Sequence, residues 1–158
     1  MMQFPDINKY PIISIFVDEN QKKNIKEMES FVKSSFNPKR LRFIVMSDVL
    51  PDNILQSDFM VFVSKDDFNK FGILKKEKEE LLKTFSDDIF INLSDDNEDM
   101  LNDYIISYIN SSFKIGHTKV NMEMHDLVID YAIEKNDVER LKILYKYILM
   151  LSGNKNEK

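Results

Sequence analysis

The sequence predicts an α/β fold. Short apolar segments of strand length alternate along the chain with longer segments in which apolar residues recur at helical spacing. The strand-like segments are apolar almost throughout, which is typical of parallel strands that helices cover on both faces. Together these patterns favour a three-layer, Rossmann-like sandwich built around a mostly parallel sheet of about six strands.

Six segments are expected to be strands. They span residues 11–17, 41–46, 59–63, 89–93, 113–115 and 127–129. Only a loop's worth of residues separates the fifth segment from the sixth, so a crossover helix does not fit between them. We therefore expect these two strands to form an antiparallel pair at one edge of the sheet.

Four segments are expected to be helices. The first, residues 25–36, carries apolar residues at helical spacing and ends where Pro38 disfavours helix in the residue before it. The others are expected at 75–85, after residue 95 and from residue 136 onward, the last two behind capping-box spacings. Residues 51–57 hold only a short helical turn. Gly153 is expected at the C-cap of the last helix.

The length fits one domain. With 158 residues, the chain can bury a core without help from metals or disulfides. No proline-rich or glycine-rich linker, repeat or low-complexity tract divides it. We expect a single domain over residues 1–153, followed by a frayed tail at 154–158.

Composition narrows the function classes. The chain has no cysteine, which excludes disulfides, zinc–thiolate sites and thiol nucleophiles and fits a reducing compartment. The net charge of −5 argues against a nucleic-acid partner, which would need a basic face. The N-terminus has no signal-peptide pattern and no apolar run is long enough to span a membrane. We expect a cytoplasmic protein with no membrane partner.

The usual cofactor motifs are missing. The turn after the first strand, residues 18–23, contains no glycine, so its backbone cannot close on a pyrophosphate, and the chain has no P-loop. His117, Glu123 and His125 could form a metal site, but their spacing matches no zinc motif carried by a helix, and surface or partly buried histidines are the favoured interpretation. We predict no cofactor and no metal.

Polar residues that follow the predicted strands form the best candidate site. In open α/β sheets, ligands bind at the carboxyl ends of the strands, where these residues should lie. The candidate ligand-binding residues are Asp18, Asp48, Ser64, Lys65, Asp66, Asp67, Asn69 and Asn92. The loop 64–72 also carries two phenylalanines. They could stack on a ligand, or they could anchor the loop to the core while Gly72 takes a left-handed turn, which is the favoured alternative.

Four runs of residues together resemble a known family. They are Ser-Lys-Asp-Asp-Phe-Asn-Lys-Phe-Gly at 64–72, Asp-Ile-Phe-Ile-Asn-Leu-Ser at 88–94, Phe-Lys-Ile-Gly at 113–116 and His-Asp-Leu-Val-Ile-Asp at 125–130. In this order they resemble an uncharacterised family of bacterial proteins that is known only as a domain of unknown function. The chain is also similar, at the level of the fold, to the acceptor half of heptosyltransferase-type glycosyltransferases, which act together with a second, nucleotide-sugar domain.

Three functions remain open. The leading hypothesis is a non-catalytic module that binds a small ligand or a protein partner at the carboxyl edge of the sheet. The alternative is a transferase or hydrolase for a phosphorylated or sugar substrate, with Lys65 contacting an anion and Asp66 acting as the base. The third is a homodimer through exposed aromatic side chains of the last helix, where Tyr145 and Tyr147 point to different faces.

Overall fold

The computed structural model describes residues 9–47, 59–84, 86–95, 100–117, 124–130 and 136–156. The strands are β1 (Ile12–Asp18), β2 (Arg40–Met46), β3 (Met60–Val63), β4 (Ile89–Asn92), β5 (Lys114–His117) and β6 (Leu127–Ile129). The α-helices are α1 (Ile25–Phe36), α2 (Lys76–Lys83), α3 (Met100–Tyr108) and α4 (Asp137–Asn156). Two 3₁₀ helices, η2 (Glu19–Asn24) and η3 (Lys65–Asp67), follow β1 and β3. None of the described helices is long and apolar enough to cross a membrane.

The elements follow the sequence pattern closely. Each predicted strand is present within a residue or two of its expected bounds. Helix α1 ends as expected, with Asn37 in the left-handed conformation at its C-cap. The prediction for Gly153 was wrong, because α4 continues through it to Asn156. A glycine inside a helix costs only about 1 kcal/mol relative to alanine, which does not by itself end the helix. The turn expected at 51–57 lies outside the described residues.

The six strands form one sheet in the order β3-β2-β1-β4-β5-β6, and all neighbours are parallel. The predicted antiparallel pair at the edge was therefore wrong. By residue 126 the chain is back at the start of β5, where the Asp126 N–H donates to the Lys114 carbonyl at 2.7 Å. Because β5 is only four residues long, roughly 13 Å, the nine residues 118–126 can return along it without a crossover helix.

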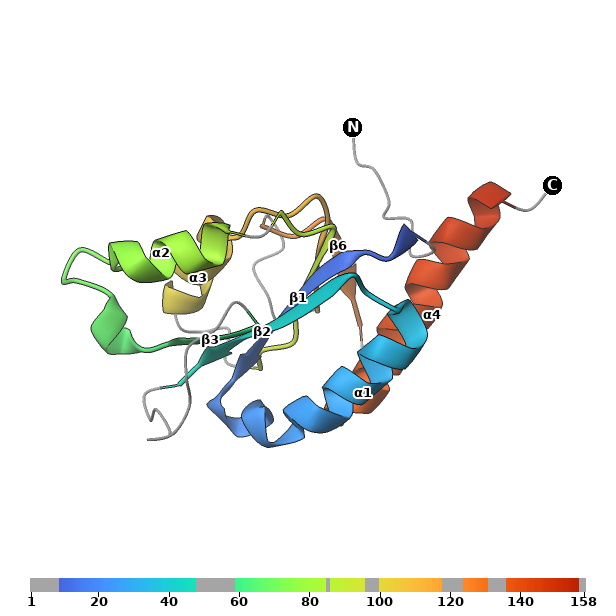
Figure 1. Ribbon diagram of the computed structural model, residues 1–158, viewed down its shortest axis with the longest axis horizontal. Coiled ribbons are helices and arrows are strands. Elements are labelled where there is room, and N and C mark those ends of the chain that lie inside the picture. Colours follow the sequence, from blue (N-terminus) through green and yellow to red (C-terminus); the bar gives the residue numbers. More distant parts are fainter. Residues whose placement is uncertain are drawn as a thin grey trace.

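Helices cover both faces of the sheet, which gives three layers (Figure 1). Helices α1 and α4 pack on one face, around buried side chains from all six strands. Helices α2 and α3 pack on the opposite face, around a second cluster that includes Phe16, Ile44 and Phe90. The alternation of side chains along a strand explains this division, since Ile15 and Phe16 are neighbours in sequence but belong to different clusters.

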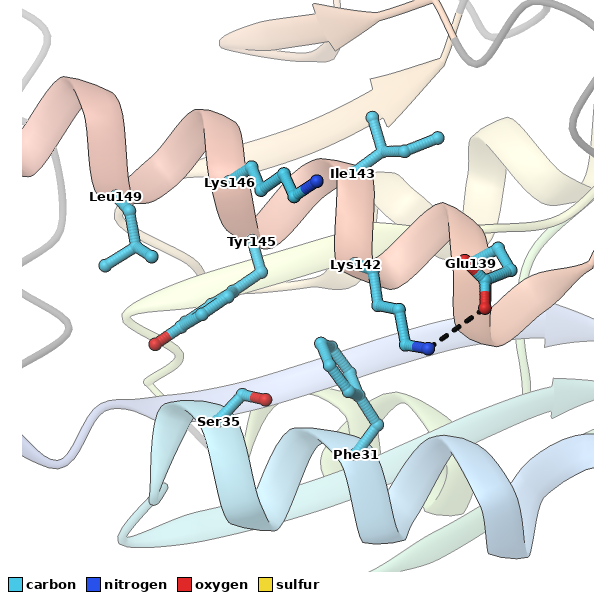
Figure 2. Close-up of a pocket in the computed structure, with 8 residues that line it drawn as sticks. All are labelled: Phe31, Ser35, Glu139, Lys142, Ile143, Tyr145, Lys146 and Leu149. Atoms are coloured by element: carbon cyan, nitrogen blue, oxygen red, sulfur yellow. Dashed lines mark hydrogen bonds and ion pairs between the residues drawn. The ribbon is translucent and has the colours of Figure 1, made fainter.

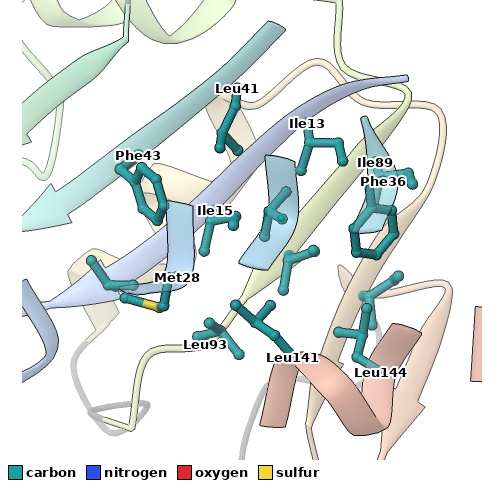
Figure 3. Close-up of a cluster of buried hydrophobic side chains, with 14 of the residues drawn as sticks. Ile13, Ile15, Met28, Phe36, Leu41, Phe43, Ile89, Leu93, Leu141 and Leu144 are labelled. Atoms are coloured by element: carbon teal, nitrogen blue, oxygen red, sulfur yellow. The ribbon is translucent and has the colours of Figure 1, made fainter. Parts of the chain in front are cut away.

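The larger cluster lies between β1, α1 and α4 (Figure 3). Ile13 and Ile15 of β1 meet Met28 of α1 and Leu141 and Leu144 of α4, and all five side chains are fully buried. Burying such a side chain stabilises the fold by about 1.5–3 kcal/mol. The central strand therefore holds two helices that lie more than a hundred residues apart in the sequence.

A buried ionic group joins the other face to α2. Arg42 donates from Nε to the Ser14 hydroxyl at 2.6 Å and from its two terminal nitrogens to the Leu81 and Leu82 carbonyls at 2.7 and 2.8 Å. These carbonyls belong to the last turn of α2, which has no partners for them within the helix. The guanidinium thus caps the C-terminal end of α2 and connects this helix to β2.

Asp87 lies beside this guanidinium. Its Oδ2 is 3.6 Å from Arg42 Nη2, and its Oδ1 accepts from the Ser14 hydroxyl at 2.8 Å. Burial raises the pKa of Asp87 to about 6, although the Arg42 charge and the hydrogen bonds act against this shift. The carboxyl therefore changes its charge close to neutral pH.

We expect Arg42→Met to lower the free energy of unfolding by about 3–5 kcal/mol, because it removes the positive charge beside a buried carboxyl and leaves two helix-end carbonyls without their donor. Urea denaturation measures this change. The matched control is Arg40→Met on the exposed start of the same strand, which should change stability by less than about 1 kcal/mol. Equal effects of the two substitutions would contradict the capping role.

The pH dependence of stability tests the raised pKa of Asp87. Its folded pKa of about 6 exceeds the ordinary value of 3.8, so the folded state keeps a proton that the unfolded chain has released. This contribution is complete below about pH 4 and is lost as the pH rises through about 6. Relative to Asp87→Asn, wild type should lose up to about 3 kcal/mol over this interval in urea titrations. If wild type instead gains stability relative to Asp87→Asn as the pH rises, Arg42 lowers the pKa of Asp87 below its ordinary value.

Candidate functional site

The sheet reverses its direction of growth at β1. After β1 the chain adds β2 and β3 on one side, then returns to place β4 on the other side. The helices that follow these two central strands leave to opposite faces, α1 to one and α3 to the other. The segments that follow β1 and β4 therefore leave the sheet in opposite directions. Ligands of open α/β sheets bind in the crevice that such a reversal creates.

Asp18 closes the end of β1. Its carboxylate accepts from the Asn20 N–H at 3.0 Å, which starts η2, and from the Asp95 N–H at 3.0 Å. Burial raises the pKa of Asp18 and the Asp95 charge raises it further, while the backbone N–H groups of Asp95, Asn20 and Gln21 oppose the shift. One candidate residue of the sequence analysis thus joins the ends of the two central strands.

Gln21 lies across the crevice itself. Its side-chain Oε1 accepts from the Asp18 N–H at 3.0 Å. Its side-chain Nε2 donates to the Leu93 carbonyl at 2.7 Å and to Asp137 Oδ1 at 2.9 Å. The side chain is almost fully buried. A single amide therefore binds the segment after β1 to the segment after β4 and to the first turn of α4.

The first turn of α4 completes this arrangement. Asp137 Oδ2 accepts from the Asn24 amide at 2.9 Å, and Arg140 Nη1 lies 3.6 Å from Asp137 Oδ1. Arg140 Nη1 also donates to both oxygens of Asp95, at 2.9 and 3.0 Å. We call this set the switch-point network. Its members are Asp18, Gln21, Asn24, Asp95, Asp137 and Arg140.

Asn92 lies beside the network at the end of β4. It is fully buried, its Oδ1 accepts from the Ser94 N–H at 3.1 Å, and its Nδ2 lies 3.4 Å from Nε2 of His125. His117 Nε2 donates to the Ser94 carbonyl at 2.7 Å. Both histidines therefore contact the segment that ends β4. Among the described residues, which leave out Glu123, no group of three metal-ligating side chains is present.

The loop after β3 uses its polar residues for its own structure. Ser64 donates its N–H to Asp67 Oδ2 at 2.9 Å, and the Asp67 N–H donates to the Ser64 carbonyl at 3.1 Å. Asp67 also lies within ion-pair distance of Lys75 and Lys78, at 3.8 and 4.0 Å. Between them, Lys65 and Asp66 are exposed.

Asn69 shapes the rest of that loop. Its Oδ1 accepts from the N–H groups of Phe71 and Ile73, at 2.8 and 3.0 Å. Gly72 has a φ of +77°, which confirms the predicted left-handed turn. Phe68 packs partly buried against the smaller core cluster, but Phe71 is exposed, so only one of the two aromatic side chains anchors the loop.

The structure divides the candidate residues into two groups. Asp18 and Asn92 end the neighbouring strands β1 and β4. The residues from Ser64 to Asn69 follow β3, two strands from β1 and three from β4, or roughly 10 and 14 Å away. Asp48 lies outside the described residues.

A groove lies elsewhere, between α1 and α4 (Figure 2). It has a volume of about 410 Å³. Its lining consists of Phe31, Ser35, Glu139, Lys142, Ile143, Tyr145, Lys146 and Leu149. The Tyr145 ring packs edge-on against Phe31, with the ring centres 6.1 Å apart. Lys142 forms an ion pair with Glu139 at 3.0 Å. The groove thus combines an apolar floor with two cationic side chains.

The groove continues onto an exposed apolar stripe of α4. Ile143, Tyr147 and Met150 follow one another at a spacing of one helical turn, and Leu149 lies at the groove. Tyr147 is 45% exposed and Met150 is 61% exposed. Tyr145 and Tyr147 do point to different faces, as predicted, with Tyr145 packed against α1 and Tyr147 in solvent.

The sequence analysis missed Gln21, Asp137, Arg140 and the groove. Gln21 stands in a charged turn, where a glutamine carries no local signal of burial. Asp137 and Arg140 lie in the first turn of the last helix, where the sequence analysis identified only a capping-box spacing. The stripe on α4 was detectable, because Ile143, Tyr147 and Met150 have the spacing of a second apolar face.

Comparison with known proteins gives a single kind of match. Residues 3–151 match the model of a family described as a family of unknown function, DUF6913. No curated protein and no solved structure matches the chain.

We expect Gln21→Leu to lower the free energy of unfolding by about 2–4 kcal/mol, because it removes three hydrogen bonds and leaves buried partners unsatisfied. Lys23→Leu in the same 3₁₀ helix is the matched control, since its side chain is exposed, and should stay within about 0.5 kcal/mol of wild type. Urea denaturation measures both. A Gln21 variant as stable as the control would mean that water replaces the amide and that the crevice is open.

Proposed function

Because the chain belongs to DUF6913, a family of unknown function, we propose a function from the geometry alone: it is a non-catalytic module that binds a partner protein. The partner's segment lies in the groove between α1 and α4 and covers the apolar stripe of α4. The observation that carries this proposal is the continuity of the groove with that stripe.

The side chains that line the groove indicate which kind of partner segment would bind there. Phe31 and Tyr145 offer an apolar floor, and Lys142 and Lys146 offer cations at its rim (Figure 2). An apolar side chain on the floor would exclude water, and a carboxylate would balance the one positive charge that remains after Lys142 pairs with Glu139. An amphipathic helix that carries acidic residues has both features, and helices of this kind bind in grooves through residues one turn apart.

A protein fits this surface better than a small ligand does. A small molecule of the groove's volume would leave Tyr147 and Met150 in water. A partner helix of three turns would cover the groove and the stripe together. Exposed apolar areas of this extent mark interaction sites on monomeric proteins.

The switch-point network supports the non-catalytic part of the proposal. A general base needs a carboxylate or imidazole within reach of a substrate. Here Asp18 and Asp95 are held by N–H groups or by Arg140, and Gln21 lies between the strand ends. The enzyme alternative, a transferase or hydrolase that uses Lys65 and Asp66, has less support, because these exposed residues lie three strands from Asn92.

We also propose that the fold is Rossmann-like and that the protein works in the cytoplasm. The strand order β3-β2-β1-β4-β5-β6 is the order of doubly wound dinucleotide-binding sheets, which supports the first point. The glycine-free turn after β1 argues against a dinucleotide ligand. The absence of cysteine supports a reducing compartment.

Selection from a library of displayed helical peptides tests the proposed function. We expect enriched peptides to carry apolar residues one turn apart together with aspartate or glutamate. Their affinity should fall at least roughly tenfold for the variant Lys142→Glu/Lys146→Glu, since two attractive charges become repulsive. Leu149→Glu should weaken binding similarly by placing a charge in the groove.

The matched control is Lys23→Glu/Lys26→Glu, which reverses two exposed charges outside the groove. Peptides that bind all variants equally would contradict the proposed site. If no peptide is enriched and light scattering shows a dimer that Tyr147→Glu dissociates, the partner is a second copy of this chain.

A further inference from the structure

The loop that leads from η3 to α2 ends in a tightly hydrogen-bonded turn, which we call the tip (residues 69–76). The Asn69 N–H donates to the Ile73 carbonyl and the Gly72 N–H donates to the Asn69 carbonyl, both at 2.9 Å. The Asn69 side chain accepts two further N–H groups, and an antiparallel bridge joins Phe68 to Leu74 below the turn. The backbone of the tip is therefore fixed by its own contacts.

This fixed turn holds two large apolar side chains in solvent. Phe71 is 73% exposed and Ile73 is 56% exposed, whereas Leu74 between the turn and α2 is buried. Four hydrogen bonds hold a conformation that directs apolar side chains into water.

Lysines stand next to these two side chains in the sequence, and one of them lies over the Phe71 ring. Lys70 Nζ lies 5.2 Å from the centre of the Phe71 ring. Lys75 and Lys76 follow the turn and are exposed. Residues 65–76 contain four lysines and two aspartates, a local charge of +2 in a chain whose net charge is −5. The apolar tip therefore stands in a locally positive segment of an acidic protein.

We propose that the tip is a peripheral docking site for an anionic lipid surface. Phe71 and Ile73 enter the interfacial region of the bilayer, where aromatic and aliphatic side chains are buried among headgroups and upper acyl chains. Lys70, Lys75 and Lys76 meet the phosphates of anionic lipids beside them. The contact is weak and reversible, because it uses only two apolar side chains.

The size and shape of the tip favour a membrane over a protein. The loop projects from the end of the sheet that carries β3, far from α4 (Figure 1). A stable protein interface takes about 800 Å² from each partner, far more than two side chains on a projecting turn provide. The groove of a second copy does not suit the tip either, because Lys142 and Lys146 would repel its lysines.

A peripheral contact of this kind needs no membrane-spanning segment. The expectation of no membrane partner rested on the absence of a long apolar run, which concerns only spanning helices. The tip is independent of the α1–α4 groove, so each proposal can fail without the other.

Co-sedimentation with lipid vesicles tests the inference. The probes are vesicles of phosphatidylcholine alone and vesicles of phosphatidylcholine and phosphatidylglycerol in equal amounts. We expect the intact protein to sediment with the anionic vesicles at low salt, and to be released as salt screens the lysines. Phe71→Ser/Ile73→Ser should reduce binding at least roughly tenfold. Lys70→Glu/Lys76→Glu should remove the preference for anionic lipid.

The matched control is Phe59→Ser, which replaces a similarly exposed phenylalanine (58% exposed) outside the tip and should bind as wild type does. Thermal unfolding of each variant verifies that the fold is intact. The proposal is overturned if no vesicle binds at low salt, if Phe71→Ser/Ile73→Ser binds as wild type does, or if neutral and anionic vesicles bind equally.

Discussion

The amide of Gln21 is the contact that joins the two central strands of the sheet to α4. It touches three segments that are distant in sequence, the ends of β1 and β4 and the start of α4. The groove lies between α1 and α4, and the Gln21 amide holds the first turn of α4 through Asp137. The same amide fills the crevice in which sheets of this kind usually hold a ligand. One side chain therefore both closes the expected site and positions the groove that we propose instead.

Much of the fold could be predicted because its signals are local. Strands such as β1 and β4 are apolar on both faces, and α1 repeats apolar residues at helical spacing, so each element was predictable from its own residues. The edge pairing failed because a rule about typical crossovers was applied to strands of three and four residues, which a short connection can pass. Two strands joined by a short connection can pair in parallel only if that connection is long enough to return along the first strand, and a short strand makes this possible.

The candidate site could be predicted only in part, since strand order is not a local property. Asp18 and Asn92 do end neighbouring strands at the same edge, with Asn92 paired to Phe16, two residues before Asp18. Ser64 to Asn69 lie at the end of another strand, and Asp67 and Asn69 bind their own loop. Polar residues in a turn often satisfy the backbone beside them, and only the three-dimensional structure separates that use from ligand binding.

Gly72 gives this loop a particular evolutionary constraint. A Cβ atom at this position would lie 2.9 Å from the Tyr104 ring, and the φ of +77° disfavours any other residue as well. The two apolar side chains beside it point to solvent and can be exchanged by single mutations at little cost to folding. Natural variation can therefore change what the loop contacts while leaving its shape unchanged. We expect Gly72 to be conserved wherever this turn is present, and the two apolar positions beside it to vary with what the loop binds.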